Sequence, residues 1–253
     1  MLAALLLGPI IVIKASTVVP ATADLLLETF NDVTNYDDGL AGANSWAETT
    51  AGTTPTLDSN ETVLCSTGTG WSSQCLENTV AGSNRKAYSM NDLGSARADA
   101  IYITYHMYMV AMTAWTVGQS HVLLGGTTTS AAIPGAASPF VATLEWDDDG
   151  VEGGESNCAS GANLPACWRL RMRIGGGTSR APEITVAANH NIRFKVDNGS
   201  AVGEAWLDGV QYLFTEQTST DVQYIWQGIM EFSPAAESIV YDNTKVSTGG
   251  YVD

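Results

Sequence analysis

The chain has 253 residues, of which 45% are hydrophobic and only 15% are charged, so it can fold around a core and is not a disordered chain. Its 27 acidic residues against 11 basic ones give a formal net charge of -16 at pH 7. A phosphate backbone would repel this average charge, so the composition argues against a nucleic-acid-binding protein.

The N-terminal segment is apolar up to Lys14, which is too short for a membrane span, so no membrane span is expected. Its length fits the apolar region of a signal peptide, and Ala21-Thr22-Ala23 supplies small residues for cleavage before Asp24. The basic residues that open most signal peptides are missing here. Residues 1–23 are therefore predicted to be the signal peptide of a secreted protein or an uncleaved apolar arm through which a particle-surface protein self-assembles.

The four cysteines form two close pairs, and each pair brackets a loop rich in small polar residues. Zinc sites prefer about two to four residues between paired cysteines, and these gaps are wider, with no histidine beside them. We predict two local disulfides, Cys65–Cys75 and Cys158–Cys167, which agree with an oxidising compartment. The alternative is four unpaired residues in the core.

Short runs of alternating apolar and polar residues follow, without a strong amphipathic helix. The clearest runs cover residues 100–110, 120–125, 140–146, 168–174, 192–196, 204–214, 222–232 and 238–247. Within 204–214, Asp208-Gly209 is typical of a two-residue hairpin turn that requires positive φ. No repeat or linker interrupts the pattern. It predicts one all-β domain over residues 24–253, built as a β-sandwich or a barrel.

Alternation also assigns the two faces of each strand. In 100–110 we expect Ile101, Ile103, Tyr105, Met107 and Met109 to face the core. The same argument places apolar positions inward in the next clear strands: Trp168, Leu170, Met172 and Ile174, and Ile192, Phe194 and Val196. The intervening polar side chains are expected on wetted faces.

The last quarter of the chain resembles a known superfamily. IRFKVDNGSAVGEAWLDGVQYLF, then VQYIWQGIMEF and the closing SIVYDNTKVSTGGYVD, resemble the C-terminal strands of concanavalin A-like jelly rolls. That superfamily includes laminin-G-like domains, legume lectins, family 16 glucanases and polysaccharide lyases. LLLETFND resembles the matching first strand, which in this fold lies beside the last one. The resemblance implies the fold, an all-β jelly roll in which two antiparallel sheets pack as a sandwich, and it leaves lectin, enzyme and structural functions open.

The resemblance also implies a structural calcium ion between the first and last strands. Glu28 and Asp242 occupy the positions that would supply carboxylate ligands, with carbonyls and waters completing the shell. The alternative for Asp242 is a carboxylate that accepts local backbone N–H groups. Apart from this calcium, no cofactor is expected.

The stretch EWDDDGVEGGE at residues 145–155 is dense in carboxylates. Glu145, Asp147 and Asp149 alternate as the catalytic acids of family 16 glucanases do, but the third acid is a shorter Asp, and Gly150 takes the alternative position. The same three acids with Gly150 match the first part of an EF-hand calcium loop, although its last ligand is replaced by Ser156. A solvated acidic turn is the main expectation, with a calcium loop as the minor one.

Cationic residues gather between residues 169 and 195, which stands out in an acidic chain. They are Arg169, Arg171, Arg173, Arg180, Arg193 and Lys195. If strands 168–174 and 192–196 share a sheet, most of them line one polar face that suits carboxylate or sulfate groups of an acidic polysaccharide. The alternative is a set of cross-strand pairs with acids such as Glu145 and Glu204.

Exposed aromatic residues form a second stripe that could stack on sugar rings: Tyr102, His106, Tyr108 and Trp206. Polysaccharide lyases of the superfamily carry a Tyr and a His as acid and base, with a cation on the uronate. By that resemblance a lyase here would use Tyr102, His106, Tyr108, His121 and Arg171. The tight lyase motifs are absent from the sequence, and QSH at 119–121 is only a partial match.

The sequence therefore favours a secreted or particle-surface β-sandwich without catalytic activity. Its expected function is to bind a glycan in the manner of a lectin, to serve as a structural part of a surface assembly or virion, or both. The glycan-binding residues would be Tyr102, His106, Tyr108, Arg169, Arg171, Arg173, Arg193, Lys195 and Trp206. The alternative is a polysaccharide lyase or another carbohydrate-active enzyme on acidic glycans.

Overall fold

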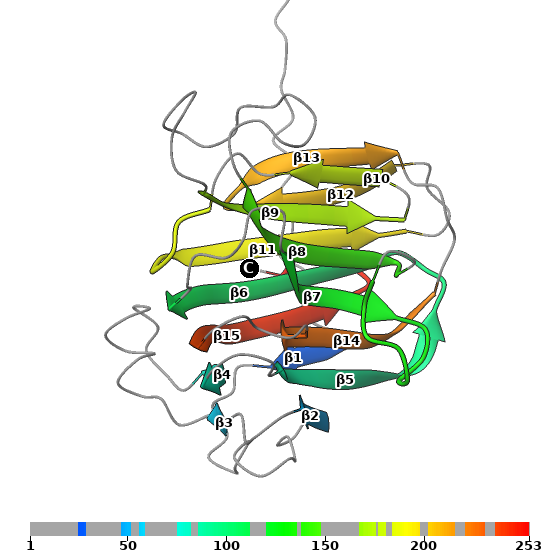
Figure 1. Ribbon diagram of the computed structural model, residues 1–253. Helices are drawn as coiled ribbons and strands as arrows, with labels where there is room; N and C mark the ends of the chain where they lie inside the picture. The colour runs from blue at the N-terminus through cyan, green and yellow to red at the C-terminus, as the bar shows by residue number, and fades with distance from the viewer. Residues whose placement is uncertain are drawn as a thin grey trace, which may run out of the picture.

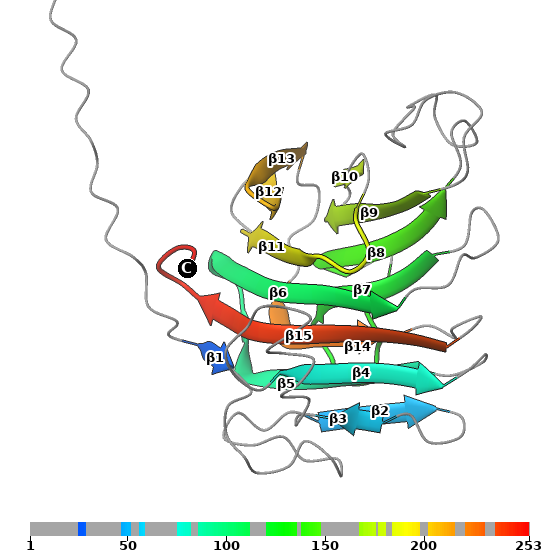
Figure 2. The ribbon, with the colours of Figure 1, turned by 90° about the vertical axis from the view of Figure 1, so that its left-hand side faces the viewer.

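The computed structural model describes thirteen ranges of the chain. They are residues 25–28, 47–51, 56–58, 75–81, 86–111, 120–135, 138–147, 167–175, 177–180, 184–197, 202–215, 221–230 and 236–252. All regular secondary structure in these ranges is β-strand, arranged as two antiparallel sheets that face each other (Figures 1 and 2). The predicted all-β, two-sheet antiparallel sandwich is confirmed. Nowhere in these ranges is there a helix long and apolar enough to cross a membrane.

The first sheet, sheet A, has eight strands. Their order is β13 (Val210–Thr215), β12 (Val202–Leu207), β11 (Asn189–Val196), β6 (Ile101–Ala111), β15 (Ala236–Ser247), β4 (Leu76–Ala81) and β3 (Thr56–Asp58). The eighth strand, β1 (Leu26–Glu28), also pairs with β15, in a register that places Leu26 opposite Val246. The first strand therefore lies beside the last one, as the resemblance implied.

The second sheet, sheet B, has seven strands. Their order is β10 (Gly177–Arg180), β9 (Cys167–Ile174), β8 (Phe140–Asp147), β7 (Ser120–Thr127), β14 (Val222–Ile229), β5 (Lys86–Arg97) and β2 (Ala47–Ala51). The sequence runs did not include β5, whose buried Ser89 and Asn91 are polar, so its inward face is not marked by apolar residues.

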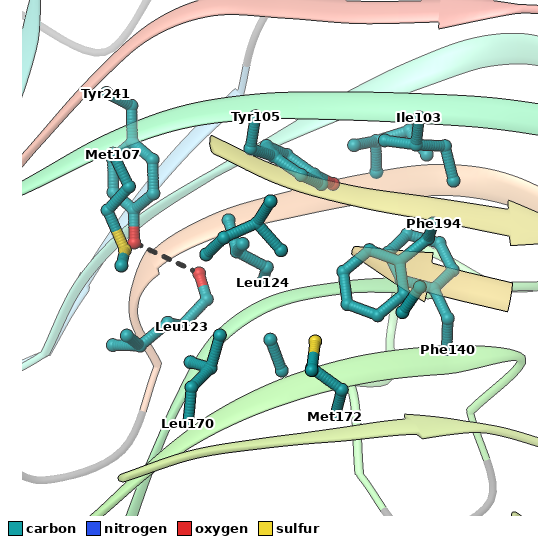
Figure 3. Packing of buried hydrophobic residues seen from close by; sticks show 14 of the residues in the cluster. Ile103, Tyr105, Met107, Leu123, Leu124, Phe140, Leu170, Met172, Phe194 and Tyr241 are labelled. Atoms are coloured by element: carbon teal, nitrogen blue, oxygen red, sulfur yellow. Dashed lines mark hydrogen bonds between the residues drawn. The ribbon is translucent and has the colours of Figure 1, made fainter. Parts of the chain in front are cut away.

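The core lies between the sheets and contains the side chains that alternation placed inward. Ile103, Tyr105 and Met107 of β6 face Leu170 and Met172 of β9, all buried (Figure 3). The rings of Phe140 and Phe194 meet across the core with centroids 5.0 Å apart, so each sheet contributes one half of the contact. The Tyr241 hydroxyl donates to the Leu123 carbonyl over 3.2 Å, which satisfies a polar group that burial would otherwise penalise (Figure 3).

The β12–β13 hairpin has the predicted turn. Asp208 and Gly209 have φ values of 51° and 82°, the left-handed conformation that a tight two-residue turn requires. Trp206 is therefore held opposite Gln211, at the end of a regular ladder.

The condition for a single basic face is not met. Strands 168–174 and 192–196 do not share a sheet, because β9 belongs to sheet B and β11 to sheet A. Both strands bury their apolar residues in the same core, so their polar residues point to opposite sides of the sandwich. The cationic residues therefore form two separate groups.

Candidate functional site

The outer face of sheet A gathers aromatic and cationic side chains from three adjacent strands. The ladder places Lys195 of β11 opposite Tyr102 of β6, and Arg193 of β11 opposite Trp206 of β12. Ile192, Phe194 and Val196 are buried, so Arg193 and Lys195 must point outward. We call Tyr102, Arg193, Lys195 and Trp206 the aromatic–basic face.

Tyr251, beyond the end of β15, packs against this face. Its ring meets Tyr102 edge-on with centroids 5.1 Å apart and meets Trp206 edge-on at 4.8 Å. The guanidinium of Arg193 lies 5.8 Å from the centre of the Tyr251 ring. Edge-to-face contacts of this kind are favourable beyond the area that they bury. The sequence had not singled out Tyr251, and no linear motif connects it with residues 45 or more positions away.

Lys195 is held by acidic neighbours on the same face. Its Nζ lies 3.3 Å from Glu204 Oε1 and 3.7 Å from Asp197 Oδ2, and it sits 6.0 Å from the centre of the Tyr102 ring. Desolvation acts to lower the pKa of Lys195, but the hydrogen bond with Glu204 and the nearby charges outweigh it, so the pKa is raised. Lys195 therefore stays cationic, and its charge is partly balanced, as the cross-strand alternative predicted.

Asn191 connects Arg193 to His106 through its side-chain amide. Arg193 Nε donates to Asn191 Oδ1 over 2.9 Å, and Asn191 Nδ2 lies 3.0 Å from His106 Nε2. An arginine only donates, so the amide oxygen must face Arg193 and the NH2 must face His106. Asn191 therefore orients Arg193, and this role was not predicted.

The predicted aromatic stripe is only partly available to a ligand. Tyr108 is 9% exposed and packs with Cys75 and Val240 in a small apolar cluster on the outer side of sheet A. His106 is half-buried and lies farther along β6 than Tyr102. Of the predicted stripe, Tyr102 and Trp206 are the rings that belong to the aromatic–basic face.

The arginines of β9 lie on the outer face of sheet B, on the opposite side of the sandwich. Arg171 forms an ion pair with Glu145 of β8, with 2.8 Å between Nη1 and Oε1. Arg169 is only 2% exposed, and Arg173 is half-buried. The expectation of one continuous basic groove is therefore wrong. The Arg180 side chain lies outside the described residues.

His121, the other histidine of the proposed lyase set, faces the interior. Its Nε2 lies 3.3 Å from Glu237 Oε2, and both side chains are almost completely buried between the sheets. Tyr102 and His106 lie outside sheet A, Arg171 lies outside sheet B, and His121 lies between the sheets. The structure does not bring the five predicted lyase residues together.

The calcium predictions are open. Asp242 is buried, and its Oδ1 and Oδ2 accept the backbone and side-chain N–H groups of Asn243, each over 2.7 Å. Glu28 pairs in register with Thr244, but its side chain lies outside the described residues. Across the described ranges no three His, Cys, Asp or Glu side chains cluster as a metal site. The site between the first and last strands stays a prediction.

The second calcium candidate and the cysteines are mostly outside the described residues. Glu145 binds Arg171, whereas the side chain of Asp147 and all of Asp149 are not described. Cys75 is buried at the start of β4 and is in a disulfide bond. The pairings Cys65–Cys75 and Cys158–Cys167 stay predictions, because Cys65, Cys158 and the side chain of Cys167 are not described.

Comparison with known proteins identifies the fold but no family. No family model matches the chain, and no curated protein matches it in sequence. A cellulose-induced protein, Cip1, aligns with a TM-score of 0.51 and 9% identity, over 82% of this chain and 93% of its own. The ligand-binding domain of botulinum neurotoxin serotype D, in complex with N-acetylneuraminic acid, aligns with a TM-score of 0.52 and 7% identity. That alignment covers 88% of this chain and 47% of the toxin chain, so this chain spans less than half of it.

A third structure is more distant. The alginate lyase AlyC3 in complex with dimannuronate aligns over 69% of this chain and 74% of its own, with 8% identity and a TM-score of 0.44. A similarity at that level supports no argument about activity. The two alignments with TM-scores above 0.5 show that the β-sandwich is a known fold.

Proposed function

We propose that this protein is a non-catalytic, lectin-like module that binds an acidic glycan through the aromatic–basic face of sheet A. The observation that carries the proposal is the meeting of two aromatic rings, Tyr102 and Trp206, with two cations, Arg193 and Lys195, on three neighbouring strands. Aromatic rings pack on the C–H faces of sugar rings, and guanidinium and ammonium groups bind carboxylates or sulfates.

Rigid placement on strands favours binding through this face. The side chains project from paired strands, and Asn191 holds Arg193 by a hydrogen bond, so little conformational freedom is lost when a ligand binds. A toxin domain of similar fold was solved with N-acetylneuraminic acid, an acidic sugar, which supports the choice of ligand class. The fold and the closing strands together support membership of the concanavalin A-like superfamily.

The proposal is tested by binding to a glycan array, followed by titration calorimetry with the best anionic glycan. We expect Trp206→Ala and Arg193→Gln each to weaken binding about tenfold, since both groups are central in the face. Binding should also weaken as salt is raised, because screening reduces the attraction between the cations and the glycan. An array on which no glycan is bound would overturn the proposal.

Matched controls come from the opposite side of the sandwich. Tyr224→Ala removes an aromatic ring, and Arg171→Gln removes a cation, on the outer face of sheet B. Both variants should bind the glycan as the native protein does. Loss of binding in these variants, with Trp206→Ala unaffected, would move the site to sheet B.

The enzymatic alternative is tested with the same protein. A lyase would release unsaturated uronate products that absorb in the ultraviolet, from a panel of polyuronates. We expect no release, because Tyr102, His121 and Arg171 lie in three separate places. Product release by the native protein would replace the binding proposal with a catalytic one.

We also propose that the protein acts outside the cell or at a particle surface. The disulfide-bonded Cys75 and the apolar first segment support this location. Sequencing the N-terminus of the native protein distinguishes cleavage before Asp24 from a retained arm that takes part in self-assembly. A rise in melting temperature with calcium that is reversed by a chelator would support the calcium prediction.

A further inference from the structure

The segment that follows β15 crosses the aromatic–basic face. β15 ends at Ser247, and the red end of the chain curls back beside β15 and β6 (Figure 2). Thr104 Oγ1, on the outer side of β6, donates to the Val252 carbonyl over 3.5 Å. The segment Thr248–Val252 thereby places Tyr251 between Tyr102 and Trp206.

Tyr251 occupies the position on this face that a sugar ring would take. Its phenol ring contacts both aromatic rings and lies beneath the Arg193 guanidinium, which are the contacts that the proposed function assigns to a ligand. A pyranose and a phenol are both six-membered rings with apolar and polar edges. The two cannot occupy this position together.

The hydroxyl of Tyr251 is poorly accommodated there. It is buried and has no hydrogen-bond partner among the described residues. A buried polar group without a partner is unfavourable, and its cost is removed when the group returns to water. Burial also raises the pKa of Tyr251, with smaller contributions from Glu204 and Tyr102, so the phenol stays neutral and offers no charge to Arg193 and Lys195.

Two side-chain hydrogen bonds hold the backbone of the segment. The carbonyls of Gly250 and Val252 accept one hydrogen bond each, from Ser247 Oγ and Thr104 Oγ1. Thr248 and Gly249 are exposed, and Gly250 has a φ of 136°, which glycine adopts without strain. Two successive glycines let the chain pivot after β15 at little conformational cost.

We propose that Gly249–Val252 is a displaceable strap that competes with an acidic glycan for the aromatic–basic face. This inference rests on the proposed function and adds its regulation. A glycan carboxylate or sulfate would bring a negative charge to Arg193 and Lys195, which the neutral phenol of Tyr251 does not carry. The apparent affinity equals the intrinsic affinity reduced by the fraction of molecules in which the strap is open.

The test compares the native protein with Tyr251→Ala and Tyr251→Phe by titration with alginate, polygalacturonate and heparin, and with neutral dextran as a control. Tyr251→Ala removes the competing ring and should raise the affinity for at least one anionic polysaccharide about tenfold or more. Tyr251→Phe keeps the ring without its unpartnered hydroxyl, so the strap should hold better and the affinity should fall below that of the native protein. Thr104→Val removes the hydrogen bond that holds the Val252 carbonyl, so it should raise the affinity for the anionic polysaccharide, as Tyr251→Ala does.

Hydrogen exchange provides a readout that affinity alone lacks. Amides of residues 249–252 should exchange faster when the anionic polysaccharide is bound, because the strap has left the face. A structural contact unrelated to binding would leave this exchange unchanged or slow it. That result would overturn the strap proposal even if the Tyr251 and Thr104 variants change the affinity for the polysaccharide.

The outcomes separate the two proposals. If the native protein binds and Tyr251→Ala binds more weakly, Tyr251 is part of the platform, so the strap is wrong and the glycan-binding proposal stands. If neither the native protein nor Tyr251→Ala binds any of the polysaccharides, both proposals are overturned. Thermal melts of each variant confirm folding, and Thr104→Val carries the test if Tyr251→Ala does not fold.

Discussion

Asn191 Nδ2 and His106 Nε2 lie 3.0 Å apart, across the ladder that joins β11 to β6. The same amide accepts a hydrogen bond from Arg193 Nε, so its orientation is decided by a group that can only donate. His106 Nε2 must then accept, which places the ring proton of the neutral histidine on Nδ1. The protonation of one histidine is thereby coupled to the position of an arginine on the aromatic–basic face.

This coupling predicts the tautomer of His106. Nitrogen chemical shifts in an NMR spectrum at neutral pH should show Nε2 unprotonated and Nδ1 protonated. Acidification protonates Nε2 and makes both partners donors, so the Asn191 side-chain amide signals should shift together with those of His106. In Asn191→Leu, His106 Nε2 loses its hydrogen-bond donor, so the nitrogen shifts of His106 should change. Asn189→Leu, two residues earlier on β11, is the control and should leave these shifts as they are in the native protein. A protonated Nε2 at neutral pH would show that the amide is oriented the other way.

Alkaline pH should destabilise the protein. Burial raises the pKa of Tyr105, Tyr212, Tyr241 and Tyr251 above the ordinary value of 10.0, because the phenolate is desolvated. The folded state therefore holds these protons more tightly than the unfolded state does. Their contribution to stability is complete below the unfolded pKa of 10.0 and is lost as pH rises through the raised folded values. Lys195, whose pKa is also raised from 10.5, acts in the same direction.

Denaturant unfolding in a pH series checks this prediction. The free energy of unfolding should fall from about pH 10 upward, and phenolate absorbance should rise mainly with unfolding. Tyr251→Phe should flatten the fall, because one of the shifted groups is gone. A smooth titration of all tyrosines near their ordinary pKa, with no loss of stability, would contradict it.

The β12–β13 turn should depend on the Asp208 carboxylate. Asp208 Oδ2 lies 2.7 Å from His190 Nδ1, and Asp208 Oδ1 accepts the Asn191 backbone N–H over 2.8 Å. The other His190 nitrogen lies 2.8 Å from the Thr185 carbonyl, so both ring nitrogens face acceptors. Asp208→Asn keeps a residue that tolerates positive φ but turns an NH2 group toward one of these donors.

We expect Asp208→Asn to lower the free energy of unfolding by about 1–3 kcal/mol, measured by urea denaturation. Asp92→Asn is the matched control, because Asp92 is also exposed and also accepts two hydrogen bonds, but from Gly94 and Gln223 and not from a buried histidine, and it should cost less. If both variants lower the free energy of unfolding equally, the contact between Asp208 and buried His190 adds no stability beyond that of an ordinary surface hydrogen bond.

Gly228 of β14 should not tolerate a side chain. Its φ is 126°, and a Cβ there would lie 2.5 Å from the Ala87 carbonyl oxygen and 2.6 Å from Tyr88 Cα, both backbone atoms of β5. Backbone cannot move aside as a flexible side chain can, so Gly228→Ala should separate β14 from β5. We expect a loss of more than about 3 kcal/mol in thermal or urea unfolding.

Gly94 is the control that separates the cost of a positive φ from the cost of a steric clash. It also has a positive φ, of 82°, but a Cβ there meets nothing within 4 Å. Gly94→Ala should therefore cost only about 1 kcal/mol. If the two variants lose the same stability, steric contact with β5 is not the cause.

The sequence alone was enough for the fold class and for the inward faces of the strands. In β9 the apolar residues alternate with arginines: Trp168, Leu170, Met172 and Ile174. Because successive side chains of a strand point to opposite faces, only one orientation of β9 buries all four in a single core. The Asp208-Gly209 turn was equally local, because its φ values depend on the residues themselves. Such features need no knowledge of which strands become neighbours.

The sequence predicted which residues point outward, but it did not predict which of them share a face. Arg171 and Arg193 have the same outward parity and similar flanking residues, so nothing local distinguishes them. Their separation follows from the order of strands, which places β9 beside β8 and β11 beside β6. His121 shows the same limit, because its burial against Glu237 depends on how the ends of β7 and β15 meet between the sheets.

Hydrophobic periodicity by itself therefore determined that this protein is all-β and which side chains enter its core, because both follow from the spacing of neighbouring residues. Only the tertiary structure decided which outward residues act together. It joined Tyr102, Arg193, Lys195 and Trp206, and it brought Tyr251 across them from the end of the chain. Strand pairing between distant segments is set by the packing of the whole sandwich, and no local pattern contains that information.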